Sequence, residues 1–157
     1  MLLGAGRVEA IHIVGTRRAA MQSVGRATAR AGLGLEGDRY TLLAAAGSAD
    51  AKPDRHLTLI ESEEIERLAA DHDIHLAPGE SRRNVTTRGI RLNDLVGQRF
   101  SIGPVACEGM QLCEPCQYLV DLLGKPVLGP LVHRAGLTAR ILTDGEIAVG
   151  DEIVTLP

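Results

Sequence analysis

Glycine interrupts this chain 18 times in 157 residues, and the β-rich segments between the glycines are short. Residues of these segments alternate or cluster as expected for strands, and turn residues bound them. The predicted strands are 7–14, 24–31, 56–60, 84–87, 98–102, 105–110, 137–142 and 147–154. Because helices do not alternate strictly with these strands, we predict a mainly β fold with inserted helices, a closed or half-closed barrel instead of a doubly wound sheet.

Two helices are expected among the strands. Ser62 is a candidate N-cap, and the glutamates and apolar residues after it predict a helix over 62–71. Pro115 suits the first position of a helix that runs to about Leu123, because proline lacks the N–H that would be unpaired there. The stretch 44–53 is small and polar and contains glycine and proline, so we expect a surface loop or lid.

Length and charge limit the class of protein. The length indicates a single domain over 1–157. A net charge of −3 and only three aromatic residues argue against nucleic acid or an anionic membrane as a partner. No apolar window approaches the ~18 residues that cross a bilayer, and the first residues do not resemble a signal peptide, so we expect a cytoplasmic protein.

The three cysteines are an odd number, which does not indicate a disulfide framework. If Pro115 opens a helix, Cys116 lies in the first turn, where free N–H groups and the helix dipole favour a thiolate. Such a thiolate could react or bind a metal. The alternatives are that Cys113 and Cys116 are small buried residues, that they form a thioredoxin-like redox pair, or that Cys107 or His133 completes a zinc site with them.

Two further segments could bind an anion. The segment 81–89 carries guanidinium, amide and hydroxyl groups that can bracket a phosphate, although a solvated basic edge strand would show the same pattern. Its candidate ligands are Arg82, Arg83, Asn84 and Thr86. The second segment offers His133, Arg134 and Arg140, and Gly136 within it suggests a close backbone approach to another group. A single histidine after an apolar run is, however, more often structural than a ligand.

The order of several motifs resembles the MOSC domain, a family named after the C-terminal domain of molybdenum cofactor sulfurases. The matching segments are 34–39, 56–61, 82–89, 96–103, 115–116 and 145–154. The resemblance implies a β-barrel-like fold that binds the molybdenum cofactor (molybdopterin), or carries sulfur for it, around one essential cysteine. It also implies a function that does not depend on pyridoxal phosphate.

The resemblance also implies roles for individual residues. Cys116, directly after Pro115, matches the catalytic thiolate that ligates molybdenum in relatives that reduce N-hydroxylated compounds. Arg82 and Asn84 match the Arg-x-Asn segment beside the pterin phosphate, with Arg83 between them. His133, Arg134 and Arg140 correspond to further anion contacts. The chain differs from larger relatives in lacking their separate N-terminal region and in having Cys113.

Three functions follow from these observations. The first is a molybdenum-dependent oxidoreductase that reduces small N-hydroxylated substrates. Because the sequence has neither an iron–sulfur cysteine pattern nor a dinucleotide glycine fingerprint, its electrons would come from a separate flavoprotein or iron–sulfur protein. The second is a non-catalytic sulfur carrier or cofactor-handling module with a persulfide on Cys116, relayed to Cys113. The third is a structural zinc module.

Overall fold

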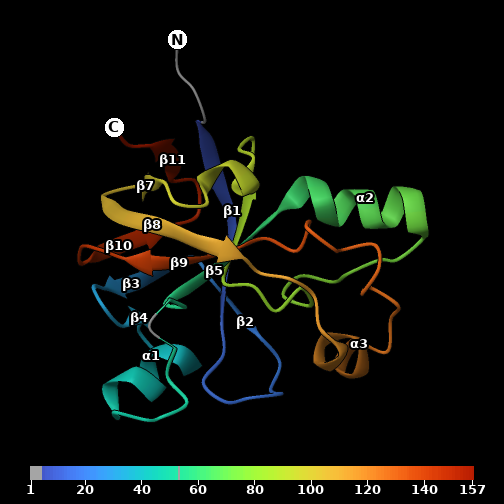
Figure 1. Ribbon diagram of the computed structural model, residues 1–157, viewed down its shortest axis with the longest axis horizontal. Helices are drawn as coiled ribbons and strands as arrows, with labels where there is room; N and C mark the ends of the chain where they lie inside the picture. Colours follow the sequence, from blue (N-terminus) through green and yellow to red (C-terminus); the bar gives the residue numbers. More distant parts are fainter. Residues whose placement is uncertain (1–4, 53) are drawn as a thin grey trace.

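The computed structural model describes residues 5–52 and 54–157, and most of their strands form one sheet that closes on itself (Figure 1). Its strands are, in spatial order, β11 (Glu152–Thr155), β7 (Arg99–Ile102), β8 (Val105–Leu112), β9 (Leu137–Ile141), β5 (Leu57–Glu61), β6 (Val85–Arg88) and β1 (Gly6–Ile13). Closure comes from β1 pairing with β11, where Gly6 lies opposite Ile153. Only β5 and β6 run parallel among these neighbours. The prediction of a mainly β barrel is confirmed.

The remaining strands lie beside the barrel. β2 (Gln22–Val24) extends the edge at β1, and a second sheet joins β10 (Gly145–Ala148), β3 (Arg26–Arg30) and β4 (Gly34–Leu35). The predicted strand 24–31 is thus two elements in different sheets, and 147–154 is likewise divided between β10 and β11. Glycine accounts for both breaks, since Gly25 and Gly150 lie between the paired segments.

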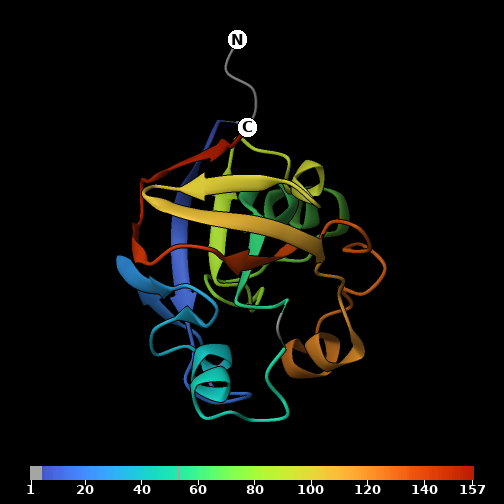
Figure 2. The same ribbon diagram turned by 60° about the vertical axis from the view of Figure 1, so that its left-hand side comes forward.

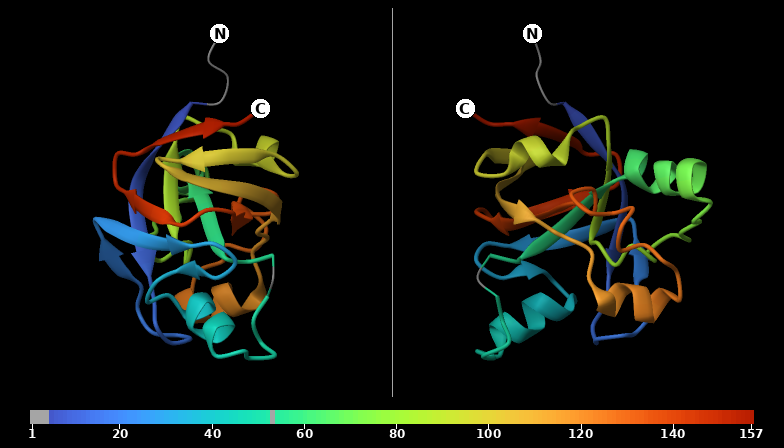
Figure 3. Two further views of the ribbon diagram at one scale, coloured as in Figure 1. Left: turned by 90° about the vertical axis from the view of Figure 1, so that its left-hand side faces the viewer. Right: turned by 45° about the vertical axis from the view of Figure 1, so that its right-hand side comes forward.

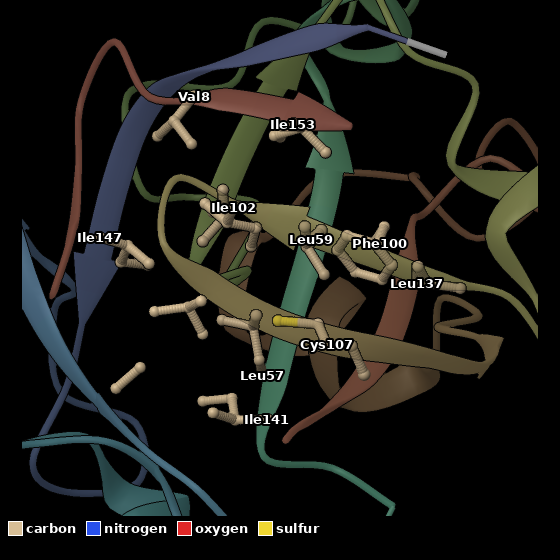
Figure 4. Close-up of a cluster of buried hydrophobic side chains, with 14 of the residues drawn as sticks. Val8, Leu57, Leu59, Phe100, Ile102, Cys107, Leu137, Ile141, Ile147 and Ile153 are labelled. Atoms are coloured by element: carbon tan, nitrogen blue, oxygen red, sulfur yellow. The ribbon is translucent and has the colours of Figure 1, made fainter. Parts of the chain in front are cut away.

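Aliphatic side chains fill the barrel interior (Figure 4). Phe100, the only phenylalanine of the chain, is fully buried among them, and so is the Cys107 side chain. Burial of each large apolar side chain contributes about 1.5–3 kcal/mol, so this interior is the main source of stability. The same burial raises the pKa of the Cys107 thiol to about 12, which makes this cysteine an apolar packing residue.

A smaller apolar cluster lies outside the barrel, between α2 (Ser62–His72) and α3 (Gln117–Leu123). It contains Leu68, Ile74, Leu119, Val127, Leu131 and Ala135. The predicted helix 62–71 corresponds to α2, but its N-cap is Glu61 and not Ser62. The Ser62 hydroxyl instead donates to the Glu9 carboxylate at 2.5 Å, because β1 passes beside the start of the helix.

The stretch 44–53 is not entirely a loop. A helix that the sequence did not suggest, α1 (Arg39–Ala45), extends into its first residues, and Pro53 falls outside the described residues. Asp38 caps α1 by accepting from the Tyr40 N–H. This cap stabilises the start of the helix, although the small polar residues of 44–53 do not favour one. A 3-10 turn, η1 (Leu92–Leu95), precedes β7.

Helices α1 and α3 lie at one end of the barrel, away from the C-terminus and the start of β1 (Figures 2 and 3). No helix within 5–52 or 54–157 is long and apolar enough to cross a membrane.

Candidate functional site

Residues of α1 and α3 help to line a cavity of about 310 Å³. Both helices lie at the same end of the barrel (Figure 2). The cavity wall comes from segments far apart in the sequence: Val14, Met21, Asp38, Arg39, Tyr40, Arg55, Thr58, Arg82, Arg83, Asn84, Cys113, Glu114, Cys116, Tyr118 and Leu119. The volume lies at the lower limit of the ~300–1,000 Å³ typical of small-molecule sites. Both predicted chemistry-bearing segments, the cysteine pair and the 81–89 segment, contribute to it.

Cys116 presents an exposed thiol at this cavity. It is the N-cap of α3, with extended backbone (φ −138°, ψ 167°), and its carbonyl accepts from the N–H of Leu119 at 3.0 Å. The prediction that Pro115 is the first helical residue, with Cys116 inside the first turn, is therefore wrong by two positions. The chain stays extended up to Cys116 because the Cys113 N–H donates to the Gly136 carbonyl and Glu114 binds His133.

The other two cysteines differ from Cys116 in their surroundings. Cys113 is buried, yet it lines the same cavity, and its carbonyl accepts from Arg83 at 3.0 Å. Cys107 lies in the barrel interior. Among the described residues, no three His, Cys, Asp or Glu side chains are grouped so that they could hold a metal ion. The hypothesis of a zinc site built on these cysteines is therefore not supported.

Arg83 and Asn84 reach the cavity wall, but the protein itself occupies their polar groups. The Arg83 guanidinium donates to the carbonyls of Ala135 at 2.9 Å, Cys113 at 3.0 Å and Ser81 at 3.4 Å. These hydrogen bonds fasten the segment 113–135, which contains α3, to the barrel. Because three of its five N–H donors already have carbonyl acceptors, Arg83 is better suited to support the cavity than to bind an anion in it.

The Asn84 side chain connects three segments around the cavity. Its amide oxygen accepts from the Thr58 N–H at 3.1 Å, and its amide nitrogen donates to the His12 carbonyl and to Asp38 at 3.1 and 3.2 Å. Asp38 also accepts from the Val14 N–H at 3.1 Å. Burial raises the pKa of Asp38, although these hydrogen bonds oppose the shift. Together they fix the start of α1 against β1.

Arg82 retains more freedom than its neighbours. Its backbone is left-handed (φ 64°), and its guanidinium donates to the Ala19 carbonyl. Two further guanidinium groups, which sequence reasoning missed, join it at the cavity. Arg39 stacks on the Tyr40 ring at 4.8 Å, and Arg55 donates to the Tyr40 hydroxyl at 3.5 Å. The sequence holds a signal for Arg39, because this residue directly precedes Tyr40, one of the two tyrosines of the chain.

Arg55 lies within electrostatic reach of both cavity cysteines. Burial alone would lower the pKa of Arg55, but the Tyr40 hydroxyl and the thiols of Cys113 and Cys116 raise it. The guanidinium thus stays positive beside the exposed sulfur.

The other tyrosine forms the edge of the cavity near α3. Arg17 and Arg18 stack on the Tyr118 ring at 4.8 and 5.5 Å, while the Tyr118 hydroxyl is buried without a hydrogen-bond partner in the described structure. With Arg99 as the exception, every arginine of the described residues that lacks an ion pair lies at this cavity or on Tyr118.

Four of the predicted anion ligands lie elsewhere. The imidazole of His133 contacts Glu114 at 2.5 Å, Arg134 pairs with Glu64 at 3.4 Å and Arg140 with Asp54 at 2.6 Å. Thr86 lines a separate hollow on the outer side of β6. None of the four is among the residues that line the cavity, so their assignment as cofactor contacts stays a prediction that the geometry does not favour.

The close approach expected at Gly136 is made to the barrel itself. A Cβ at this position would lie 1.7 Å from the Leu59 carbonyl oxygen, and the residue has a φ of 104°. Only glycine meets both conditions. The glycine therefore serves packing of the 113–136 loop on β5 and does not make room for a ligand.

Comparison with known proteins gives both a family match and a set of similar structures. The family model of the MOSC domain matches residues 46–154. The structure resembles YuaD from Bacillus subtilis, with a TM-score of 0.79 and 18% identity over 95% of this chain and 94% of that one. It also resembles YiiM from Geobacillus stearothermophilus, with a TM-score of 0.72 and 17% identity over 97% of this chain and 75% of that one. For YiiM from Escherichia coli the TM-score is 0.68 and the identity 19%, over 96% of this chain and 70% of that one. At these identities the structures show a shared fold alone, and the curated proteins give no match.

Proposed function

The chain belongs to the MOSC domain family, and from this premise we propose that it binds the molybdenum cofactor in the cavity that Cys116 lines. The observation that carries the proposal is the placement of one exposed thiol among guanidinium groups that have no carboxylate partner in the described structure. Molybdenum favours soft thiolate ligands, and the pterin phosphate requires cations.

The residues at the cavity match the chemistry of that group. Cys116 would supply the sulfur ligand, and Arg55 would place a positive charge near it. Arg39, Arg55 and Arg82 are the candidates for the phosphate, and Arg82 is the one that the sequence also predicts. The unpartnered Tyr118 hydroxyl offers one further hydrogen bond at the edge of the same space. Asn84 and Arg83 would act indirectly, by holding the wall in place.

When bound, the cofactor would supply two-electron redox chemistry at its metal. The reaction we propose is the reduction of an N-hydroxylated compound: R–NH–OH takes up two electrons and two protons, the N–O bond breaks, and R–NH₂ and water leave. A separate flavoprotein or iron–sulfur protein would supply the electrons. The protein would contribute position and positive potential, because partly buried guanidinium groups stabilise anionic groups better there than in water.

A second candidate function is favoured by Cys113, which lines the same cavity as Cys116. In a sulfur carrier, Cys116 would hold a persulfide, and the Cys113 thiol could receive the outer sulfur by forming a new S–S bond while the Cys116 thiolate leaves. Arg55 would stabilise either anion, since its charge acts on both sulfurs.

Elemental and pterin analysis separates the two functions. The protein is purified without oxygen from a host that makes the cofactor, and molybdenum, zinc, pterin and cyanide-labile sulfur are measured on the same sample. About one molybdenum and one pterin per chain are expected. Labile sulfur on Cys116 without molybdenum would instead support the carrier. Neither molybdenum nor labile sulfur would reject both.

A further inference from the structure

A second, larger hollow of about 720 Å³ adjoins the cysteine cavity. The two share Arg39 and Tyr40 as a common wall. Beyond that wall, the hollow is bordered by the loops 16–17 and 49–52, which lie around the α1 end of the barrel. A molecule that passes Tyr40 would therefore extend from one space into the other.

The charge of this hollow is positive. Arg17, Arg39 and Lys52 line it, against one carboxylate, Asp50. None of the three cations forms an ion pair with any residue in 5–52 or 54–157. The chain as a whole has a net charge of −3, and carboxylates pair with most of its other arginines. The excess of positive charge is therefore confined to the region of this hollow. Cations gathered in a concave site concentrate positive potential and attract anions.

We propose that this hollow binds an anionic group of the substrate, a carboxylate or a phosphate, while the N-hydroxylated end of the same molecule reaches the Cys116 cavity. This inference rests on the function proposed above, because it takes the cofactor to bind at Cys116. The substrate class is then an N-hydroxylated compound whose negative charge lies beyond Tyr40 from the reacting group.

An acidic protein that donates electrons could also use these cations. The concave shape favours the small molecule, since Arg17 and Lys52 line a hollow that continues into the reaction cavity through Arg39 and Tyr40. A docking protein would need protruding contacts and no continuity with that cavity. The experiment separates the two, because a docking site for a donor protein cannot change the preference between two substrates when a small-molecule reductant supplies the electrons.

The test compares benzamidoxime with 4-carboxybenzamidoxime, which share the reacting group and differ in charge. Reduced methyl viologen serves as the electron source, and kcat/KM is measured for both compounds. The wild-type protein should prefer the carboxylate roughly tenfold, and the preference should fall with added salt. Lys52→Gln and Arg17→Gln should each reduce the preference roughly two- to fivefold, the range expected when one solvent-exposed charge contact with the ligand is lost.

Arg26→Gln is the matched control, because Arg26 is an exposed arginine on β3 outside both spaces and should leave the preference unchanged. Equal kcat/KM for the two amidoximes, or an equal loss for both in the Lys52 variant, would overturn the proposal.

A binding measurement makes the test independent of turnover. Calorimetry compares benzamide with 4-carboxybenzamide on cofactor-free protein, and the carboxylate should bind tighter in wild type than in Lys52→Gln. Equal binding of the two probes would overturn the anion hollow. A protein that reduces neither amidoxime and holds no pterin, yet prefers the carboxylate probe, would instead reject the proposed function and leave the hollow as an anion site.

Discussion

The walls of the barrel and its open end use arginine in opposite ways. Along the strands and their loops the guanidinium groups meet carboxylates: Arg30 contacts Glu36 at 2.7 Å, and Arg88 bonds with Glu9 and Glu66. At the open end, Arg39 and Arg55 meet tyrosine instead. A neutralised guanidinium has no charge left for a ligand, whereas a stacked one keeps its charge. The contrast favours the open end as the place where an anionic ligand binds.

The cysteines show the same division. The Cys107 thiol, fully buried in the barrel, has a raised pKa and behaves as an apolar group, while the Cys116 thiol is exposed beside Arg55. The difference lies in solvation and in the nearest charge, not in residue type. Four experiments test this contrast.

Cys116→Ser should have the largest effect. We expect a loss of at least roughly a thousandfold in cofactor-dependent reduction, because the metal ligand itself is removed and even supporting groups of metal sites contribute about 10–100-fold. The thermal midpoint should stay unchanged, since the side chain is exposed. Cys113→Ser is the control and should retain a substantial part of the activity. Equal activity in wild type and Cys116→Ser would remove Cys116 from the site.

Arg83→Met should affect stability more than binding. It leaves the carbonyls of Ala135, Cys113 and Ser81 without their donor, at a cost of about 2–4 kcal/mol for buried acceptors. Urea unfolding measures this loss. Unchanged stability together with absence of pterin would instead make Arg83 a direct phosphate ligand, as the sequence predicts.

Arg82→Ala should affect binding more than stability. Removing a charge-assisted hydrogen bond from a partly buried site corresponds to about 1.5–3 kcal/mol, or roughly ten- to over a hundredfold in cofactor affinity. Pterin content after identical purification measures it, with the thermal midpoint as the check on folding. Arg30→Ala, which removes an exposed ion-paired arginine, should retain full pterin content. Full content in both variants would place the phosphate at Arg39 and Arg55.

The smallest effect concerns acid stability and has opposite signs for two carboxyl groups. The Ser62 hydroxyl and Arg88 lower the pKa of Glu9, so its stabilisation is present above the ordinary value of 4.5 and is lost as the pH falls through the lowered pKa. Burial raises the pKa of Asp38 above its ordinary 3.8, so its contribution is present at low pH and is lost as the pH rises through the raised pKa.

Glu9→Gln should therefore flatten the acid branch of a stability curve, and Asp38→Asn should steepen it. Urea unfolding at several pH values below 6 measures both slopes. Two slopes that change in the same direction would contradict this assignment.

Local sequence patterns predicted several parts of the molecule correctly. Period-two runs and glycine breaks indicated the strands, and the apolar face over 65–69 indicated α2, because these signals depend on neighbours along the chain. They could not predict α1, since its cap Asp38 is held by Val14 and Asn84, which adjoin β1 and β6. They also misplaced the start of α3, which depends on contacts of Cys113 and Glu114 with the loop before β9.

The functional site shows the same difference between what local sequence predicts and what distant contacts decide. By its own chemistry and motif order, the sequence determined that Cys116 and the 82–84 segment are the residues to consider, and that the fold is a β barrel. Only the tertiary structure decided which arginines keep a free charge. Pairing depends on which carboxylates the folded chain brings within 4 Å: Arg134 and Arg140 find Glu64 and Asp54, whereas Arg39 and Arg55 find Tyr40. The two ion pairs arise from the pairing of β5 with β9, which joins distant segments of the chain and has no signature in any local stretch of residues.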